Sequence, residues 1–371
     1  MKRSQTVLLL LIGFLAALPL WGQDMNNTPV PELILPMYRT QITVPDIMGY
    51  QTLKCDFHMH TVFSDGIVWP QIRVQEAWLN GLDVIAITDH IRKDPSKEKL
   101  PGDNNQPYEF ARSRSQELGI LLIKAGEISR KMPPGHFNAL FLQDVNVLNQ
   151  EDAMVAIEAA VKQGAFIQWN HPGWKSQQPD TTKWWPEHQR IYEKGWMHGI
   201  EVFNHTEWYP IALDWCLSKN LTVLCDSDLH GATSLQYDLQ RWPRPMTLVF
   251  CQDRSEAAVK EALFAGRTVA WFGDQLAGKA EYLQALFRAA IKILPAHYSD
   301  DKGNRFLHLV NSYDLPWKIK EASAAFRGEV WLPASGSVVI KLAPEVNSLN
   351  LIMPNAYISG RQNLQLTYTL P

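Results

Sequence analysis

Two short segments far apart in the chain each carry metal-ligating side chains two residues apart. The first, CDFHMHTVFSDG, contains His58 and His60, and the second, DSDLHG, contains Asp228 and His230. Residues i and i+2 of an extended strand point to the same side. We therefore expect each pair to present two ligands on one side of a strand end.

Further segments between these two carry side chains of the same kind. They are ITDH, AGEIS, GHFNAL and NHPGW, which contain His90, Glu127, His136 and His171. Most of the segments follow or include a run rich in Val, Ile, Leu and Phe, which is typical of a buried strand. This repetition predicts a polynuclear metal site.

Strand-like and helix-like runs alternate from Leu53 onward. The expected strands are Leu53–His58, Asp83–Thr88, Ile120–Gly126, His136–Leu142, Ala165–Trp169, Gly199–Phe203, Leu221–Asp226 and Met246–Phe250. The expected helices are Pro70–Asn80, Pro107–Leu118, Glu151–Gln163, Lys183–Glu193, Ile211–Lys219 and Ser255–Ala265. This alternation predicts an α/β fold with a parallel sheet and crossover helices, and the number of strands favours a closed barrel.

Most candidate ligands fall at the C-terminal ends of expected strands, where barrel enzymes carry their chemistry. His136 is the exception because it begins its run. We therefore expect an extra or reversed element to bring it to the site.

The pattern changes from about Gly278. One helix is expected at Ala280–Ile293, followed by short strands at Leu307–Val310, Val330–Leu332, Val338–Leu342, Leu349–Met353 and Leu364–Tyr368. Short strands between Pro, Gly and Asn indicate a small all-β module. The expected divisions are a signal peptide at residues 1–22, an extended lead-in at 23–51, the barrel at 52–277 and the β module at 278–371.

The N-terminus has the features of a secretory signal. Lys2 and Arg3 precede an almost unbroken apolar stretch, Val7–Leu18. The stretch is short for a bilayer span, which favours cleavage near Gly22. We expect a periplasmic or secreted mature protein with no membrane span after cleavage; an uncleaved anchor is the alternative.

The chain has four cysteines. Cys55, Cys225 and Cys251 lie in apolar, strand-like runs and are interpreted as small buried hydrophobes. An oxidising compartment would also allow a Cys216–Cys225 bridge, which the sequence leaves open. The chain contains no CxxC pair, which argues against a thiolate zinc site.

The charge balance excludes one class of partner. The net charge is −3 and the pI is about 6.4. No long nucleic acid is expected, because there is no surplus of Lys and Arg to neutralise its phosphates. A small phosphorylated substrate remains compatible, since a metal site supplies its own positive charge.

Nine residues are candidate metal ligands: His58, His60, Asp65, His90, Glu127, His136, His171, Asp228 and His230. Mixed imidazole and carboxylate donors suit zinc, manganese or iron. A carboxylate such as Glu127 can bridge two cations, and a hydroxide shared between them is a nucleophile near neutral pH.

The ordered set HxH…SDG, TDH, GE, GH, NHP and DxH resembles the PHP family of metal-dependent phosphoesterases, over about residues 52 to 275. The resemblance implies a distorted (β/α)7 barrel that holds two to three divalent transition metals. It implies one site of His58, His60, Glu127 and Asp228, a second of Glu127, His136 and His171, and a third of Asp65, His90 and His230. It says little about the substrate.

The expected activity is a secreted phosphoesterase that hydrolyses a sugar or nucleotide phosphomonoester, or a short diester, by a metal-bound hydroxide. The residues expected to carry catalysis are His58, His60, Glu127 and Asp228. The residues expected to contact substrate lie just beyond ligand segments or on the same rim, and are Arg92, Arg130, Lys131, Lys175, Asn204 and His205. Each of the cationic ones has a solvated surface charge as the alternative.

Two further groups of residues lie close to the ligands in sequence. Asp56 and Asp89 neighbour ligand histidines and are interpreted as groups that orient them. Six tryptophans lie from Trp169 to Trp208 and form either packing or an aromatic wall that stacks on a base or sugar.

Two other functions compete with the phosphoesterase. Metal-dependent amidohydrolases also open with HxH and close with a late Asp, but they do not call for the SDG turn of Asp65 or for His230. A catalytically silent secreted binding protein is the second alternative, although no expected ligand is replaced by an inert residue.

Overall fold

The computed structural model describes residues 30–91, 100, 102–323, 325–326 and 328–370. Residues up to Tyr38 form one unit, with a 3-10 helix at Pro31–Leu33, and residues from Arg39 onward form the other. The expected signal peptide and Arg92 lie outside the described residues. Within the described ranges, no helix has the length and apolar character to cross a bilayer.

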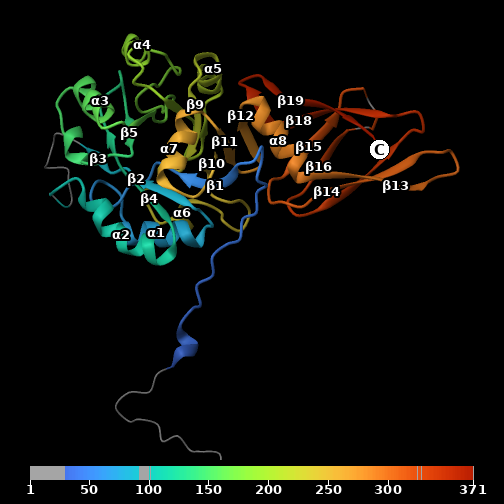
Figure 1. Cartoon of the computed structure of the whole chain (residues 1–371), viewed down its shortest axis with the longest axis horizontal. Helices are drawn as coiled ribbons and strands as arrows, with labels where there is room; N and C mark the ends of the chain where they lie inside the picture. Colours follow the sequence, from blue (N-terminus) through green and yellow to red (C-terminus); the bar gives the residue numbers. More distant parts are fainter. Residues whose placement is uncertain (1–29, 92–99, 101, 324, 327, 371) are drawn as a thin grey trace, which may run out of the picture. The chain divides into compact units, whose positions relative to one another are not determined.

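A mixed sheet forms the centre of the second unit (Figure 1). Its strands from the middle of the chain are β1 Gln51–Asp56, β2 Val84–Ile87, β3 His90–Ile91, β4 Leu121–Ile128, β5 Phe137–Leu140, β6 Phe166–Trp169, β7 Gly199–Asn204, β8 Glu207–Trp208, β9 Thr222–Asp226 and β10 Met246–Cys251. They follow the order β10-β1-β2-β4-β5-β6-β7, with β9 paired to β7 and β3 to β4.

The sheet is not wholly parallel, which corrects the sequence-based expectation. Strand β5 runs antiparallel to both β4 and β6, and β10 runs antiparallel to β1. The reversal of β5 is the element expected at His136, because it places the start of the strand beside the end of β4. The reversal of β10 was not expected. A short helix and a loop connect β9 to β10 and allow the chain to turn back.

Side-chain hydrogen bonds link β9 to the strands at the other end of this order. Thr247 of β10 accepts from the backbone N–H of Cys225 at 2.8 Å and donates to the Cys225 carbonyl at 2.9 Å. Thr268 of β11, Thr268–Phe272, donates to the Val223 carbonyl at 2.7 Å. A mixed α/β fold is therefore present, and a fully closed barrel stays a prediction.

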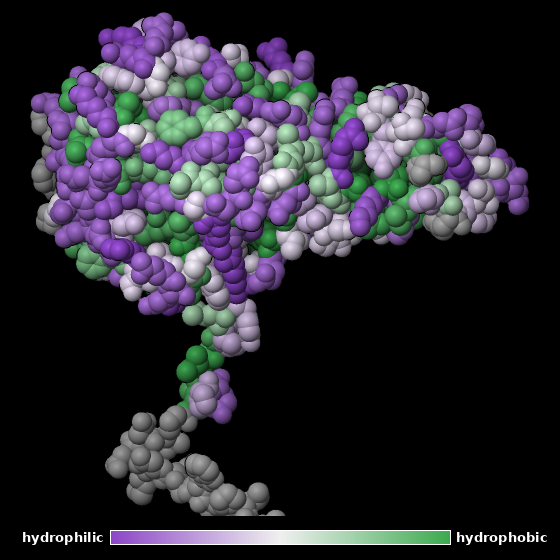
Figure 2. All heavy atoms as spheres, viewed as in Figure 1, coloured by the Kyte–Doolittle hydropathy of each residue, from purple (hydrophilic) through white to green (hydrophobic). Residues whose placement is uncertain are grey.

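The helices expected before Gly278 form with small shifts at their ends, and a short helix that was not expected, α6, follows β9. The helices are α1 Pro70–Leu79, α2 Gln106–Leu118, α3 Ala153–Lys162, α4 Pro186–Glu193, α5 Pro210–Lys219, α6 Thr233–Gln236 and α7 Glu256–Phe264, with a 3-10 helix at Val145–Leu148. Proline begins α1, α4 and α5, where its missing N–H costs no bond. Gly119 ends α2 at φ +64. Polar side chains cover much of the face drawn in Figure 2.

Most of the C-terminal strands continue the same sheet. They and their helix are β12 Gln275–Gly278, α8 Ala280–Ala290, β13 Ile291–Ser299, β14 Arg305–Asn311, β15 Trp317–Glu321, β16 Glu329–Leu332, β17 Ser337–Leu342, β18 Ser348–Ser359 and β19 Gln362–Thr369. Strand β12 pairs in parallel with β18, so the ladder crosses the boundary expected at residue 277. Strands β13, β14 and β17 form a separate small sheet.

The helix expected at Ala280–Ile293 is shorter in the structure. It ends at Ala290, and Ile291 begins β13. Helix α8 buries Leu283, Leu286 and Phe287, a spacing that marks one helical face.

All four cysteines are buried free thiols, so the alternative of a Cys216–Cys225 bridge is wrong. Cys216 has its thiol 3.5 Å from the Thr222 carbonyl. The thiols therefore fill the core as small apolar groups, as the sequence indicated for the other three.

Candidate metal centre

All nine candidate ligands gather in four overlapping groups. The groups are His60, Asp65, His90 and His230; His58, Glu127 and His171; His58, His60 and Asp228; and His90, Glu127 and His136. Within each group the potential ligand atoms lie within 4.8 Å of one another. The residues that the sequence singled out therefore lie together at one end of the sheet.

The two segments with ligands two residues apart lie side by side. Strand β1 ends at Asp56, so His58 and His60 lie just beyond it, not within a strand as expected. Met59 forms a parallel bridge with Leu229, and the His60 N–H donates to the Leu229 carbonyl at 2.9 Å. This register brings both ligand pairs to the same place.

A buried arginine holds these two segments together. The Arg73 guanidinium, fully buried, donates to the carbonyls of His60 at 2.9 Å, Leu229 at 2.9 Å and Gly231 at 2.7 Å. In the SDG turn, a Cβ added to Gly66 would lie 2.7 Å from the backbone of His60. Only glycine allows the turn to approach the ligand segment so closely.

The innermost group contains the two HxH imidazoles. Oδ1 of Asp228 lies 3.0 Å from Nε2 of His60 and 3.3 Å from Nε2 of His58. The two Nε2 atoms are themselves 3.1 Å apart. Asp228 has φ +50, a left-handed conformation that is unusual outside glycine and is common at functional sites.

Glu127 lies at the end of β4 and is central to the cluster. Its Oε1 atom lies 3.1 Å from Nδ1 of His136, 3.4 Å from Nε2 of His58 and 3.7 Å from Nε2 of His171. Its Oε2 atom contacts Nδ1 of His90. The position suits a carboxylate that bridges cations, although His136 and His171 fall in different groups and not in the single site expected for them.

The outer group opens to solvent. Asp65, whose side chain is 40% exposed, lies 3.3 Å from Nε2 of His90 and 3.2 Å from Nε2 of His230. The ring of His60 stacks on that of His230 with centroids 4.1 Å apart. This end of the cluster is the one that a substrate can reach.

Several potential ligand atoms are better suited to binding a metal ion than to forming hydrogen bonds with one another. Asp228 Oδ1, His136 Nδ1 and His171 Nδ1 are buried, and no protein group described forms a hydrogen bond with them. Several of these atoms nevertheless lie within 3.0–3.3 Å of another ligand atom. Short contacts without hydrogen-bond geometry are expected where donors point at a shared cation.

The two buried carboxylates are held ionised. Burial alone would raise the pKa of Glu127, but His136 and His90 lower it well below its usual range. For Asp228, burial is likewise opposed by His58 and His60, and the pKa falls well below normal. Anionic carboxylates are the form in which these side chains bind cations.

The imidazoles split into two kinds. Burial, with the charges of His90 and His230, lowers the pKa of His60 to about 3. Burial also opposes charge on His90, but Glu127 and Asp65 raise its pKa to about 9. Neighbouring carboxylates and imidazoles thus shift one another's pKa values strongly and in both directions. Such strongly coupled groups are typical of functional sites, including metal sites.

A buried glutamate that the sequence analysis missed supports the ligands from behind. Glu201 of β7 lies 2.7 Å from Nδ1 of His58 and accepts hydrogen bonds from the His171 N–H at 2.6 Å and from Gln168 Nε2 at 3.0 Å. The signal available was a carboxylate within the apolar run Gly199–Phe203, which we interpreted only as a strand.

The two aspartates expected to orient ligands contact backbone and hydroxyl groups. Asp56 accepts from the backbone N–H of His58 at 3.2 Å and from Ser227 Oγ at 2.5 Å. Asp89 accepts from the Thr61 N–H at 2.7 Å and from Ser64 Oγ at 2.6 Å. They therefore hold the ligand segments in place without touching an imidazole ring.

The residues expected to contact substrate are spread over different places. Arg130 directs its guanidinium to backbone carbonyls, including those of Ile91 at 3.1 Å and Ser129 at 2.8 Å. Lys131 and Lys175 are exposed on the surface. Among those that the structure describes, Asn204 and His205 are the two that line a cavity together with candidate ligands.

A cavity of about 240 Å³ adjoins the cluster. It is lined by the candidate ligands Asp228 and His230, and by Trp174, Gln236 and residues 204–207. His205 has φ +53, and its Nδ1 lies 3.3 Å from the hydroxyl of Tyr237.

Most of the six tryptophans pack against the core, and Trp169 is the one that is fully buried. Trp169 stacks on His188 and Trp215, and Trp184 contacts the same rings. Trp174 differs, because it is 39% exposed and lies beside the ring of His171. The aromatic wall considered from the sequence is therefore limited to Trp174.

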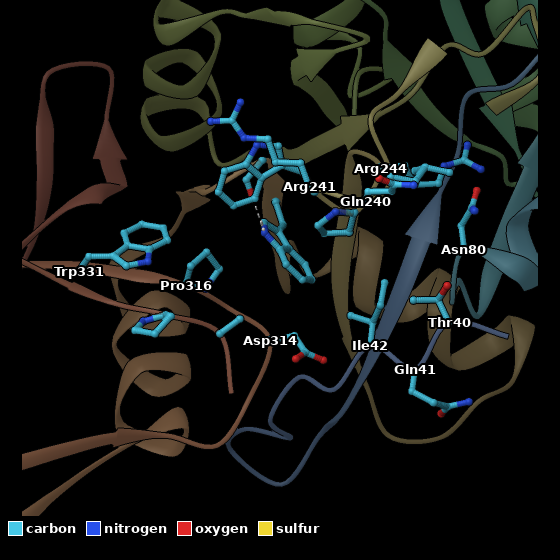
Figure 3. Close-up of a pocket in the computed structure, with 17 residues that line it drawn as sticks. Thr40, Gln41, Ile42, Asn80, Gln240, Arg241, Arg244, Asp314, Pro316 and Trp331 are labelled. Carbon is cyan, nitrogen blue, oxygen red and sulfur yellow. Dashed lines mark hydrogen bonds between the residues drawn. The ribbon is translucent and has the colours of Figure 1, made fainter. Parts of the chain in front are cut away.

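A larger cavity, of about 430 Å³, lies away from the ligands (Figure 3). Its walls come from residues 40–42, from Gln240 and Arg241 after α6, and from Pro316 and Trp331 among the C-terminal strands. None of the nine candidate ligands lines it. It is lined jointly by residues from the first part of the chain, from the loop after α6 and from the C-terminal strands.

Most of the comparisons with known proteins found no match or only a weak one. No family model matches the chain, and no curated protein matches it. A structure from Bifidobacterium adolescentis assigned as a metal-dependent phosphoesterase is 18% identical, with a TM-score of 0.37, over 48% of this chain and 88% of that one. An amidohydrolase from Chromobacterium violaceum is 13% identical, with a TM-score of 0.36, over the same shares. Likenesses this weak support no argument.

One solved structure is similar over almost the whole chain. It is a two-domain protein from Bacteroides vulgatus that contains a predicted PHP-like metal-dependent phosphoesterase. The two sequences are 43% identical, and the match covers 91% of this chain and 100% of that one with a TM-score of 0.86. With this similarity, and with the ligand motifs gathered at one end of the sheet, the chain belongs to the PHP-like metal-dependent phosphoesterases.

Proposed function

We propose that the protein hydrolyses small phosphoesters with two to three divalent cations held by the nine ligands. The observation that supports this most directly is their convergence in four overlapping groups. Asp65 and His230, which separate a phosphoesterase from an amidohydrolase in sequence, lie 3.2 Å apart within the outer group. No long nucleic acid is needed as a partner.

The ligands differ in their proposed roles according to their position in the cluster. The proposed catalytic centre is the buried set of His58, His60, Glu127 and Asp228, whose donor atoms lie within 3.5 Å of at least one other member. Divalent transition metals such as zinc, manganese or iron supply positive charge for phosphoryl oxygens and lower the pKa of a coordinated water. Glu127 keeps its negative charge close to several imidazoles, so it can serve more than one cation.

Substrate contacts are proposed for the side chains beside the ligands. Asn204 is held by a hydrogen bond from its Nδ2 to Glu201 at 2.9 Å, and His205 by its contact with Tyr237. Both line the cavity next to Asp228. His205 is the group placed to give a proton to a departing oxygen, because an imidazole can donate near neutral pH.

Phosphate release from a broad panel of phosphoesters, with added Zn²⁺ or Mn²⁺, tests the proposal. The wild type and His58→Ala are compared, with His308→Ala on β14 as a matched loss of an imidazole elsewhere. We expect hydrolysis by the wild type and the His308 variant, and a loss of about 100-fold or more in the His58 variant. Equal activity in all three would show that the catalytic centre lies elsewhere, and amine release from amide substrates without phosphate release would favour the amidohydrolase.

We further propose that the protein acts in the periplasm or outside the cell. The support is the basic start and apolar stretch at Lys2–Leu18, followed by the short run to Gly22. Intact-mass analysis of the protein from its native host, after cell fractionation, tests this. A full-length chain in the cytoplasmic fraction would contradict it.

A further inference from the structure

The cavity of about 240 Å³ beside the candidate ligands is lined by residues that can contact the organic part of a substrate. Its lining includes the candidate ligands Asp228 and His230, so the organic part of a substrate whose phosphoryl group they hold can extend into this space. Trp174 and the turn that joins β7 to β8 line the same cavity. The inference that follows rests on the proposed phosphoesterase function and deepens it.

Trp174 offers a flat apolar surface at a fixed place. Its ring meets those of His171 and His136 at centroid distances of 5.3 and 6.2 Å. Its backbone N–H donates to the His171 carbonyl at 3.0 Å, which closes a turn directly after the ligand. The side chain is still 39% exposed. A held, half-exposed indole next to a phosphate site suits stacking on a sugar or base ring.

Glu207 places a negative charge in the same cavity. The residue is half-buried in β8 and pairs with Asn204 of β7. The hydroxyl of buried Tyr209 donates to its Oε2 at 2.6 Å. Burial, with the neighbouring Glu207, raises the pKa of Tyr209 far above its usual value, so the hydroxyl stays a donor and anchors the carboxylate.

The charges around the cavity discriminate between ligands. Among the described residues that line it, none is Lys or Arg. A carboxylate accepts hydrogen bonds from hydroxyls or an ammonium group and repels a second anion. The volume of about 240 Å³ is below the range of about 300–1,000 Å³ typical of sites for larger ligands.

We propose that the substrate is a phosphomonoester of a single sugar-sized, polyhydroxylated ring that carries no second anionic group. Trp174 stacks on the ring, and Glu207 accepts hydrogen bonds from its hydroxyls or from an amino substituent. Nucleoside polyphosphates and oligonucleotides fit this cavity poorly, because their additional phosphates face Glu207.

Three pyranosyl 1-phosphates whose sugar ring carries a positive charge, no charge or a negative charge test the role of Glu207. The probes are glucosamine 1-phosphate, glucose 1-phosphate and glucuronic acid 1-phosphate, each given to the metal-supplemented full chain. We expect the wild type to hydrolyse the first two with a kcat/KM about tenfold or more above the third. Glu207→Lys should reverse this order, and Glu345→Lys, the same charge change on the exposed turn after β17, should leave it unchanged.

A probe without a ring tests Trp174. Trp174→Ala should lower kcat/KM for glucose 1-phosphate by about tenfold and leave glycerol 3-phosphate within about twofold. If phosphoesters are hydrolysed but the order of the three sugars is the same in wild type and Glu207→Lys, this inference fails and the phosphoesterase stands. If no phosphoester is hydrolysed at all, the proposed function itself fails.

Discussion

The Oε1 atom of Glu201 lies 2.7 Å from Nδ1 of His58, and both side chains are fully buried. A carboxylate only accepts hydrogen bonds, so Nδ1 must carry the proton. The other ring nitrogen, Nε2, faces Glu127 and Asp228 at 3.4 and 3.3 Å. Glu201 thus selects the tautomer in which His58 offers Nε2 to a cation.

Replacing this carboxylate by an amide tests whether it positions the ligands. Glu201→Gln keeps the size of the side chain but places an NH₂ group against donors, including the His171 N–H and Asn204 Nδ2. We expect metal affinity to fall by about 10- to 100-fold, as for other groups that orient metal ligands. Metal content per chain after equilibrium dialysis measures this.

The matched control is Glu158→Gln, which makes the same change on the exposed face of α3. It should keep wild-type metal content. A Glu201 variant that binds metal with wild-type affinity would contradict the positioning role, and circular dichroism distinguishes weakened binding from unfolding.

Metal removal should lower the thermal stability without dismantling the fold. Buried donors such as Asp228 Oδ1 and His136 Nδ1 have no hydrogen-bond partner among the described groups, so cations that engage them bind the folded chain selectively. Ligand binding to the folded state adds RT ln(1 + [L]/Kd), about 2.7 kcal/mol at 100 times Kd. We expect Tm to fall on chelation and to rise again with added Mn²⁺ or Zn²⁺ in proportion to the logarithm of its concentration.

Glu127→Gln provides the comparison, because it removes the charge nearest the centre of the cluster. Its Tm should respond much less to added metal. A wild-type Tm that does not change after elemental analysis has shown the metal to be gone would contradict the prediction.

Arg73 should be a determinant of both stability and metal binding. It is fully buried and donates to the carbonyls of His60, Leu229 and Gly231, which belong to the two ligand segments. Arg73→Met leaves three carbonyls without this donor, and we expect a loss of about 4 kcal/mol in the free energy of unfolding. Urea titration measures it, with the exposed Arg112→Met on α2 as the control, for which less than about 0.5 kcal/mol is expected.

Much of this molecule could be predicted because local signals agreed with the final structure. Proline at the start of α1 and glycine after α2 marked helix ends that the structure confirms. The reversal of β5 was anticipated because His136 stood at the wrong end of its run. The nine candidate ligands could be proposed as a set because most of their segments follow or include an apolar run of the sequence, and the structure brings them together.

Other features depend on contacts that a single sequence does not display. The antiparallel pairing of β10 with β1 joins two strands that lie far apart in the sequence, so the direction of β10 was not evident from its own residues. The end of β1 before His58 depends on Met59 pairing with Leu229, a residue distant in sequence. Arg130 looked available for substrate, yet its donors are used by nearby carbonyls once the chain folds.

Glu201 was missed because the run Gly199–Phe203 was interpreted only as an apolar strand. A fully buried carboxylate requires partners, and the cost of leaving it unpaired is large. Its place within an apolar strand was therefore a signal of function, because structural needs alone rarely put a charge there. Asp226 is a second carboxyl group buried in a strand. Its burial and the nearby Glu201 raise its pKa well above the normal value.

The interior histidine His188 should make stability depend on acid. Its Nδ1 accepts from the Trp185 N–H at 3.0 Å and its Nε2 lies 2.7 Å from the Pro134 carbonyl, so the neutral ring satisfies both contacts. Burial lowers the pKa of His188 to about 4, from an ordinary value of 6.5. As pH falls below 6.5, the unfolded chain therefore takes up a proton that the folded chain does not, and stability is lost until the pH passes below about 4.

This linkage can be isolated by comparing variants at two pH values. At about 1.36 kcal/mol per pKa unit, His188 should account for up to about 3 kcal/mol of lost stability between pH 7 and pH 4. His188→Gln should be less stable at pH 7 but should show a loss on acidification that is smaller by that amount, whereas His308→Gln should keep the wild-type difference. Urea titrations of the metal-free proteins at pH 7 and pH 4 measure the two differences. Parallel losses in wild type and His188→Gln would mean that the buried ring takes up its proton in the folded state as readily as in the unfolded one.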